Sequence, residues 1–557
     1  MHLLNRRTRF GFDRIDGAVL ALYSGMVAWT IAHHEPWSDE AQAWLLARDC
    51  SLTDLLFHRM HYEGTPGLWH VMLWALTRLH IPFAGLNWVA GAFAVLGIFV
   101  LLRYAPLPRI FRVTIPFTFF LAYQYAVVAR SYVMFPLLLF VLSVLYTAKR
   151  PRLVPFALVA GVFANLSTHA LVLAICFALL YTWEVVGRRR VEGNALWQRS
   201  DGAAGLLLAG LLGFAAIVGL PAPDVGFAVQ NKTSIGPVHA ALTRFMRPET
   251  LPPGAPPLDP LLPPEAGTPP PMNAFGHAIS DEFHNVSGPH LPRALLGMTM
   301  IILSSATFPI SESNLLACVF LGLAVLWFWS RRSLPLLLPY AALLCFLGVI
   351  WVWVHHTGLS VLTLLAAAWM AADRPQIRGP RWIEPAFASV SLVVIALQIG
   401  WTIYAVADDT GHLYDPGHAA HDFLVSHYPN AHMASYIYDT TAIQPYSDHN
   451  LFLNQPHSFW VWSSGINTDQ RRTETLAQRP DLIVVADFGI GDQVILNQWL
   501  PLFPEGEHTG HPYIAYWEDH GYHEMHRFCG RHPFRFGASN VVCDVILEPN
   551  SQVGVSR

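Results

Sequence analysis

The chain has 557 residues, of which 53% are hydrophobic and only 13% are charged. This apolar share exceeds that of ordinary soluble domains and excludes a purely soluble globular protein. The formal net charge of -4 provides no basic face for the phosphates of a nucleic acid, which excludes that class of partner.

The hydrophobic residues gather in blocks that approach the roughly 20 residues needed to cross a bilayer. These blocks predict an α-helical polytopic membrane protein with about eleven transmembrane helices. The predicted spans are 16–32, 86–102, 113–129, 132–148, 153–166, 170–186, 203–220, 314–329, 334–354, 358–372 and 385–404.

The flanking charges predict the orientation of the spans. Four arginines that end at Arg14 precede the first span, as they do in a secretory signal, but no small-residue cleavage site follows it. We therefore expect an uncleaved span with a cytoplasmic N-terminus. Short cytoplasmic loops collect Lys and Arg, and basic clusters do fall between alternate spans. These clusters lie at 103–112, 149–152, 188–199, 331–332 and 374–381.

This alternation excludes two further apolar segments from the membrane-spanning set. If 66–79 or 295–310 crossed the membrane, later basic clusters would lie outside. The first segment is also short and is interrupted by His70 and Arg78. We expect it to be a helix at the outer interface, and the second segment to be re-entrant or interfacial.

The predicted spans and their orientation divide the chain into four regions. We expect the protein to lie in the bacterial inner membrane. The C-terminal region is long enough to form a periplasmic α/β domain, with a helix at 419–426 and strands at 433–438 and 481–486. The regions are a transmembrane module at 1–220 with an outer loop at 33–85, a proline-rich periplasmic loop at 221–310, transmembrane helices at 311–404, and the α/β domain at 405–557.

An acidic pair, Asp39-Glu40, directly follows the first span. One interpretation is structural, because Ser38 is a good N-cap and acidic residues in the first turn of a helix stabilise it. The other is chemical, because two carboxylates placed where a helix leaves the bilayer can act on a membrane-borne substrate. The surrounding Trp and His residues favour the chemical interpretation.

The next outer turn carries Arg130 and Tyr132 in the sequence VVARSYVMF. Arg130 either anchors a helix end or holds a phosphate through its fork of donors. Its predicted position on the same side of the membrane as Asp39 favours the phosphate.

Three motifs together resemble the GT-C membrane glycosyltransferases, which include protein O-mannosyltransferases and the lipid A aminoarabinose transferases. They are PWSDEAQAW, HYEGTPGLWHVMLW and ARSY, within the first 220 residues. The resemblance implies transfer of a sugar from a polyprenyl-phosphate carrier to an acceptor on the periplasmic side. The acceptor is a lipid, a glycan or a protein.

This resemblance assigns roles to individual residues. Asp39 is the expected base that takes the proton of the acceptor hydroxyl, and Arg130 the expected group that stabilises the departing phosphate. A single displacement would invert the anomeric centre. Glu40 orients the acceptor, binds a divalent ion together with Asp39, or caps the helix. No cofactor other than such an ion is expected.

Further residues are candidates for the donor phosphate or the cavity. Tyr132 accompanies Arg130. Glu63 and Thr65 depart from the plainer proline motif of the family, so His61 is the substitute for the donor-binding residue. Lys232 reaches the carrier phosphate or is a solvated loop residue. The remaining cavity candidates at outer span ends are His169, His355 and His356.

The other histidines and the cysteines suggest less. His418 and His421 have helical spacing but lack the further ligands of a zinc site. Cys529 and Cys543 fall in the outer domain, where a disulfide is permitted, and Cys50 would then remain an unpaired thiol.

Two alternatives to an enzyme remain. A transporter of a lipid-linked substrate would place ionisable residues near the middle of the membrane, whereas here the polar groups cluster at outer ends. A non-catalytic envelope assembly or binding protein could use the same fold.

Overall fold

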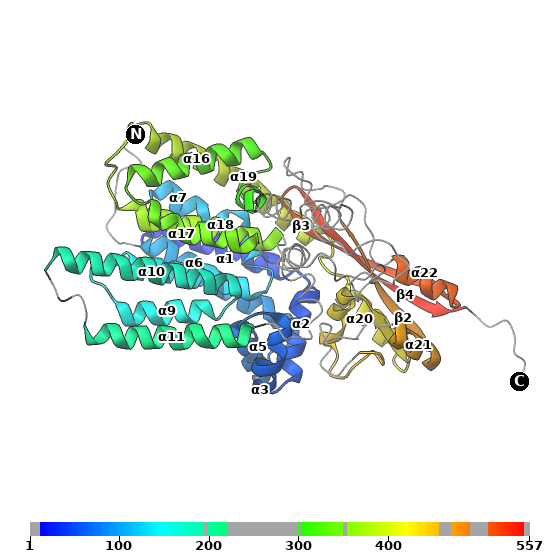
Figure 1. The fold of residues 1–557 in the computed structure, drawn as a ribbon. Helices are drawn as coiled ribbons and strands as arrows, with labels where there is room; N and C mark the ends of the chain where they lie inside the picture. The colour runs from blue at the N-terminus through cyan, green and yellow to red at the C-terminus, as the bar shows by residue number, and fades with distance from the viewer. Residues whose placement is uncertain are drawn as a thin grey trace, which may run out of the picture.

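The computed structural model describes residues 12–193, 198–220, 302–348, 354–455, 469–490 and 511–550, together with 195 and 299. A bundle of roughly parallel helices occupies one side of the molecule, and a small sheet with three helices occupies the other (Figure 1). The proline-rich part of the predicted periplasmic loop lies outside the described residues.

The bundle consists of long apolar helices, which supports a membrane protein. Among the described residues, four helices are long and apolar enough to cross a bilayer: Phe83–Tyr104, Thr168–Val191, Arg199–Gly219 and Ile383–Gly411. The number of eleven spans stays a prediction. The bundle helices are α1 (Arg14–Ile31), α6 (Leu86–Tyr104), α8 (Phe135–Tyr146), α9 (Leu153–Ala164), α10 (Thr168–Val191), α11 (Arg199–Gly219), α16 (Asn314–Ser330), α17 (Leu338–Leu347), α18 (Val354–Ala372) and α19 (Ile383–Gly411).

The predicted span at 113–129 is not one continuous helix. It is divided into α7 (Arg109–Thr114), the 3₁₀ turn η4 (Ile115–Phe117) and the π-helical turn η5 (Phe120–Gln124). Pro116 cannot donate a backbone hydrogen bond, which explains the first break. The irregular backbone that follows is buried inside the protein, the condition under which non-helical backbone is tolerated at membrane depth.

The first outer loop folds across one end of the bundle, next to the sheet domain (Figure 1). Helix α5 packs against α2 through a buried apolar cluster that includes Trp44, Trp69 and Leu73. The left-handed backbone of Gly67, with φ of 88°, lets α5 begin directly after the turn. The loop contains α2 (Ser38–Asp49), α3 (Leu52–Asp54), η2 (Leu55–Arg59), α4 (Met60–Glu63), α5 (Leu68–Arg78) and η3 (Phe83–Gly85).

The C-terminal region contains a four-stranded sheet in the order β1-β2-β4-β3. β1 and β2 are parallel, and the other pairs are antiparallel. The predicted helix and both predicted strands are present. Cys529 and Cys543, which the sequence permits but does not require to pair, form a disulfide. The elements are α20 (Gly417–His427), β1 (Met433–Tyr436), η8 (Tyr438–Tyr446), α21 (Asp469–Gln478), β2 (Leu482–Ile490), α22 (His511–Asp519), β3 (Tyr522–Phe534) and β4 (Gly537–Pro549).

The tip of the β3–β4 hairpin packs into the helix bundle. The ring of Phe534 lies 5.2 Å from that of Phe119 and 5.4 Å from that of Phe308. The Arg535 guanidinium is buried over the rings of Phe308 and Trp401. These contacts fix the sheet domain over the end of the bundle where the first outer loop lies.

Candidate functional site

Asp39 lies in the first turn of α2, between the bundle and the sheet domain. Its Oδ2 forms an ion pair with the Arg130 guanidinium, and its Oδ1 accepts a hydrogen bond of 2.7 Å from the Tyr438 hydroxyl. The Asp39 side chain keeps 19% of its surface exposed. The carboxylate is therefore fixed in orientation by a residue of the bundle and a residue of the sheet domain, yet remains accessible.

Arg130 stands at the end of the irregular segment that follows η5. Its guanidinium lies over the rings of Trp37 and Tyr132, at 5.7 and 5.9 Å from the ring centroids. Among the described residues, its hydrogen-bond partners are Asp39 and His355, and both bind Nη1. Arg130 therefore keeps Nη2 and Nε to bind a further anion, such as a phosphate.

The three histidines predicted as cavity candidates meet beside Tyr132. The His169 ring stacks on that of His356 at 5.0 Å, and both lie within 6.2 Å of the Tyr132 ring. The His355 ring is 5.7 Å from the same tyrosine. Side chains of α10, of α18 and of the 3₁₀ turn η6 (Ser131–Met134) thus form one aromatic group adjacent to Arg130.

Glu40 has an environment different from that of its neighbour. It is fully buried, and its Oε2 accepts a hydrogen bond of 3.0 Å from the backbone N–H of Trp37, the N-cap residue of α2. Its Oε1 accepts bonds from the Asn87 amide at 2.8 Å and the Ala129 N–H at 2.6 Å. These bonds support the capping interpretation. They also join the start of α2 to α6 and to the residue before Arg130.

A buried histidine pairs with Glu40 from the opposite side. His34 Nδ1 lies 2.9 Å from Asp409 Oδ2, and its Nε2 lies 3.7 Å from Glu40 Oε2. Burial by itself lowers the pKa of His34, but the two carboxylates outweigh burial and raise this pKa to about 10. His34 is therefore a cation at neutral pH, held between two carboxylates.

The sheet domain adds acidic residues of its own. The Ser38 hydroxyl donates a hydrogen bond of 3.0 Å to Asp439. Burial and then the charge of Asp415 raise the pKa of Asp439 to about 6, and burial raises that of Asp415 to about 8. The preceding Ile437 has a φ of 73°, an outlier for a β-branched residue. Such strain is typical of functional sites and here turns Tyr438 and Asp439 toward α2.

Other predicted residues lie farther from this arrangement. His61, on α4, is half-buried, and its Nδ1 lies 2.6 Å from the carbonyl oxygen of Leu220 at the end of α11. Glu63 accepts a long hydrogen bond of 3.5 Å from Gln42, and its charge acts on Arg130. Lys232 lies outside the described residues.

Sequence reasoning did not identify the partners from the C-terminal domain. Tyr438 and Asp439 stand about 400 positions after α2, in a segment without a recognisable motif. His34, which follows the first predicted span, is not among the predicted site residues either. The strained backbone at Ile437 has no sequence signal either, because isoleucine gives no indication of a positive φ.

The arrangement suits recognition of an anion beside a carboxylate that can accept a proton.

In the described part of the chain, no group of three or more His, Cys, Asp or Glu residues is placed to hold a metal ion. His418 and His421 instead pack on the ring of Tyr446.

Comparison with protein-family models, curated proteins and solved structures gives no match to this chain. The resemblance to the GT-C enzymes therefore stays a hypothesis that rests on the motifs and on the site.

Proposed function

We propose that this chain is a membrane glycosyltransferase. It moves a sugar from a polyprenyl-phosphate carrier to a hydroxyl acceptor on the periplasmic face of a bacterial inner membrane, with inversion. The observation that carries the proposal is the pairing of an accessible carboxylate, Asp39, with an arginine that keeps donors for a phosphate.

Asp39 has the chemistry of a general base. An acceptor hydroxyl is a weak nucleophile, and a positioned carboxylate that takes its proton contributes typically ~10²- to 10⁴-fold. Tyr438 fixes one carboxylate oxygen, while the other faces Arg130. When a donor phosphate binds the guanidinium, it competes with Asp39 for the positive charge. The carboxylate then becomes available for the acceptor proton.

The reaction balances without a further reactant. The acceptor oxygen forms a bond to the anomeric carbon while the bond from that carbon to the phosphate oxygen breaks. The proton of the acceptor moves to Asp39, and the carrier phosphate leaves as an anion. Arg130 stabilises the charge that develops on this leaving group by preorganised hydrogen bonds.

The ring surfaces around the site suit a sugar. Trp37 and Tyr132 flank the Arg130 guanidinium, and His355 contacts it. Aromatic side chains offer an apolar face with polar edges, a combination that suits the faces of a pyranose ring. Glu40 and His34 hold the start of α2 in place beneath these groups.

The test is sugar transfer by the purified full-length protein in nanodiscs. A panel of polyprenyl-phosphate sugars is supplied with lipid and glycan acceptors, and Asp39→Asn is compared with Asp54→Asn. Asp54 is a matched control because it is an arginine-paired carboxylate of the same outer loop. We expect Asp39→Asn to lose at least ~100-fold in transfer rate and Asp54→Asn to keep the wild-type rate.

Two results would contradict the proposal. A wild-type transfer rate in Asp39→Asn would show that Asp39 is not the general base. Tight binding of lipid-linked sugar without any turnover, across the whole panel, would instead favour a binding or assembly protein of the same architecture.

A further inference from the structure

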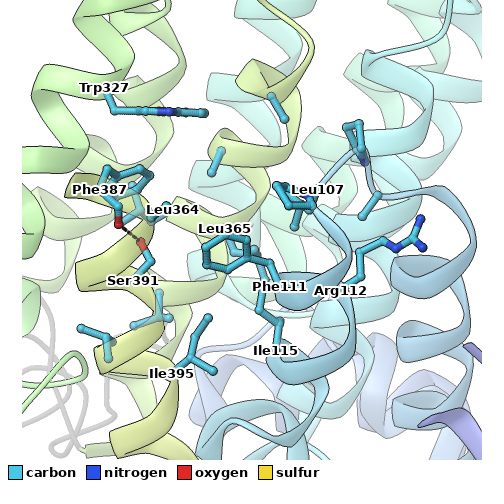
Figure 2. A pocket seen from close by; sticks show the side chains of 18 of the residues that line it. Leu107, Phe111, Arg112, Ile115, Trp327, Leu364, Leu365, Phe387, Ser391 and Ile395 are labelled. Atoms are coloured by element: carbon cyan, nitrogen blue, oxygen red, sulfur yellow. Dashed lines mark hydrogen bonds between the residues drawn. The ribbon is translucent and has the colours of Figure 1, made fainter. Parts of the chain in front are cut away.

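A large cavity lies inside the bundle, separate from the Asp39 site. Its volume is about 1350 Å³, above the roughly 300–1,000 Å³ of typical small-molecule sites. Its walls come from the loop after α6, from α7 and η4, and from α16, α18 and α19. Figure 2 shows Leu107, Phe111 and Ile115 facing Leu365 and Phe387 across it.

The deep part of the cavity is mainly apolar. Aromatic and aliphatic side chains from both walls line it, together with small polar groups such as Ser391, whose hydroxyl already bonds to the carbonyl of Phe387 at 2.7 Å. A space of this size and lining suits hydrocarbon chains rather than a polar metabolite.

The rim of the cavity is strongly basic. Of the eight charged residues that line it, two are acidic, Asp373 and Glu384, and six are basic, a net charge of +4. The six basic residues are Arg103, Arg109, Arg112, Lys149, Arg331 and Arg374. They belong to the ends of the helices that point away from the sheet domain. By the positive-inside rule, this end faces the cytoplasm.

Several of these cations are paired, but donors remain. Four of the six are already paired. Arg109 pairs with Asp13, Arg331 with Glu384 and Arg374 with Glu184. Arg112 Nη2 lies 3.5 Å from the carboxylate of the buried Asp16. Among the described residues, Arg103 Nη1 and Arg112 Nε are buried without a hydrogen-bond partner. A buried guanidinium nitrogen without a partner is costly, which indicates that an anionic group belongs beside them.

We propose that this cavity holds an anionic glycerophospholipid from the cytoplasmic leaflet. Its phosphate binds the guanidinium groups of Arg103 and Arg112, and its acyl chains fill the space between α7 and α19. Basic pockets between transmembrane helices on the cytoplasmic side are suited to anionic headgroups. This proposal depends on the basic end of the bundle facing the cytoplasm. It does not depend on the protein being a glycosyltransferase.

The experiment measures lipid retention by the full-length protein with native mass spectrometry. Detergent-exchanged protein is incubated with phosphatidylglycerol, with phosphatidylcholine of the same acyl chains, or with undecaprenyl phosphate. Arg103→Gln removes a rim charge, and Ser391→Phe fills the apolar part without a change of charge. Arg381→Gln is the control, because Arg381 is an exposed cation at the same end that does not line the cavity.

We expect the wild type to retain one phosphatidylglycerol in preference to phosphatidylcholine. Arg103→Gln should lower this retention about fivefold, the effect of one cation near an anionic headgroup. Ser391→Phe should lower it at least as much, and Arg381→Gln should leave it unchanged. If Arg103→Gln does not fold, the decision falls to Ser391→Phe, which keeps every charge.

Three outcomes would overturn the proposal: equal retention of the two phospholipids, wild-type retention by Ser391→Phe, or a preference for undecaprenyl phosphate. Asp39→Asn separates this proposal from that of glycosyl transfer. It should abolish transfer and keep phosphatidylglycerol bound, so that each idea can fail without the other.

Discussion

Glu40→Gln tests the different roles that the structure gives to two adjacent carboxylates. The wild-type side chain is fully buried and accepts hydrogen bonds at 2.6, 2.8 and 3.0 Å, from the Ala129 N–H, the Asn87 amide and the Trp37 N–H. A glutamine amide can keep one oxygen toward two of these donors. Its NH₂ group must then face the remaining N–H and the His34 cation.

The cost of this substitution follows from those contacts. Hydrogen bonds to a charged acceptor contribute about 1.5–3 kcal/mol each, and removal of one member of a buried ion pair costs about 3–5 kcal/mol. We expect Glu40→Gln to lose about 3–5 kcal/mol of unfolding free energy. The thermal midpoint should fall by roughly 3–5 °C, because a given free-energy loss shifts the midpoint less in a larger protein.

The assay is thermal unfolding in detergent, followed by tryptophan fluorescence, with Asp39→Asn as the matched neighbour. Asp39 and its partner Arg130 are both partly exposed, at 19% and 27% of their side-chain surfaces. The midpoint of Asp39→Asn should therefore move by about 1 °C or less. Equal midpoints for Glu40→Gln and the wild type would refute the structural role of Glu40. If the thermal midpoint is unchanged but sugar transfer is lost, Glu40 takes part in the reaction itself.

Two further predictions concern the same network. Tyr438→Phe removes the hydroxyl that fixes Asp39, so the transfer rate should fall by about tenfold while the thermal midpoint changes little. A wild-type transfer rate in this variant would contradict a positioning role for Tyr438. His34 has a pKa raised above its unfolded value, so its contribution to stability is complete below pH about 6.5 and is lost as the pH rises toward about 10. In pH-dependent unfolding, His34→Gln should flatten this alkaline loss, and an unchanged slope would show that other groups cause it.

Several features of the fold could be predicted from local sequence alone. The apolar blocks predicted the long helices, because a helix that meets hydrocarbon must be apolar over its whole length. The run of strand-forming residues at 481–486 predicted β2, which lies buried in the sheet. In contrast, the predicted span at 113–129 is broken, because a buried position can satisfy irregular backbone in ways that hydropathy does not show.

The acidic pair shows where local information ends. The sequence by itself determined that Asp39 and Glu40 begin a helix next to a span, because capping and charge near a helix N-terminus are local effects. Only the tertiary structure decided that Glu40 points into the protein toward Asn87, and that Asp39 meets Arg130 and Tyr438. Adjacent helical residues point in directions about 100° apart, and what each one meets is set by segments up to about 400 positions away, which no local pattern encodes.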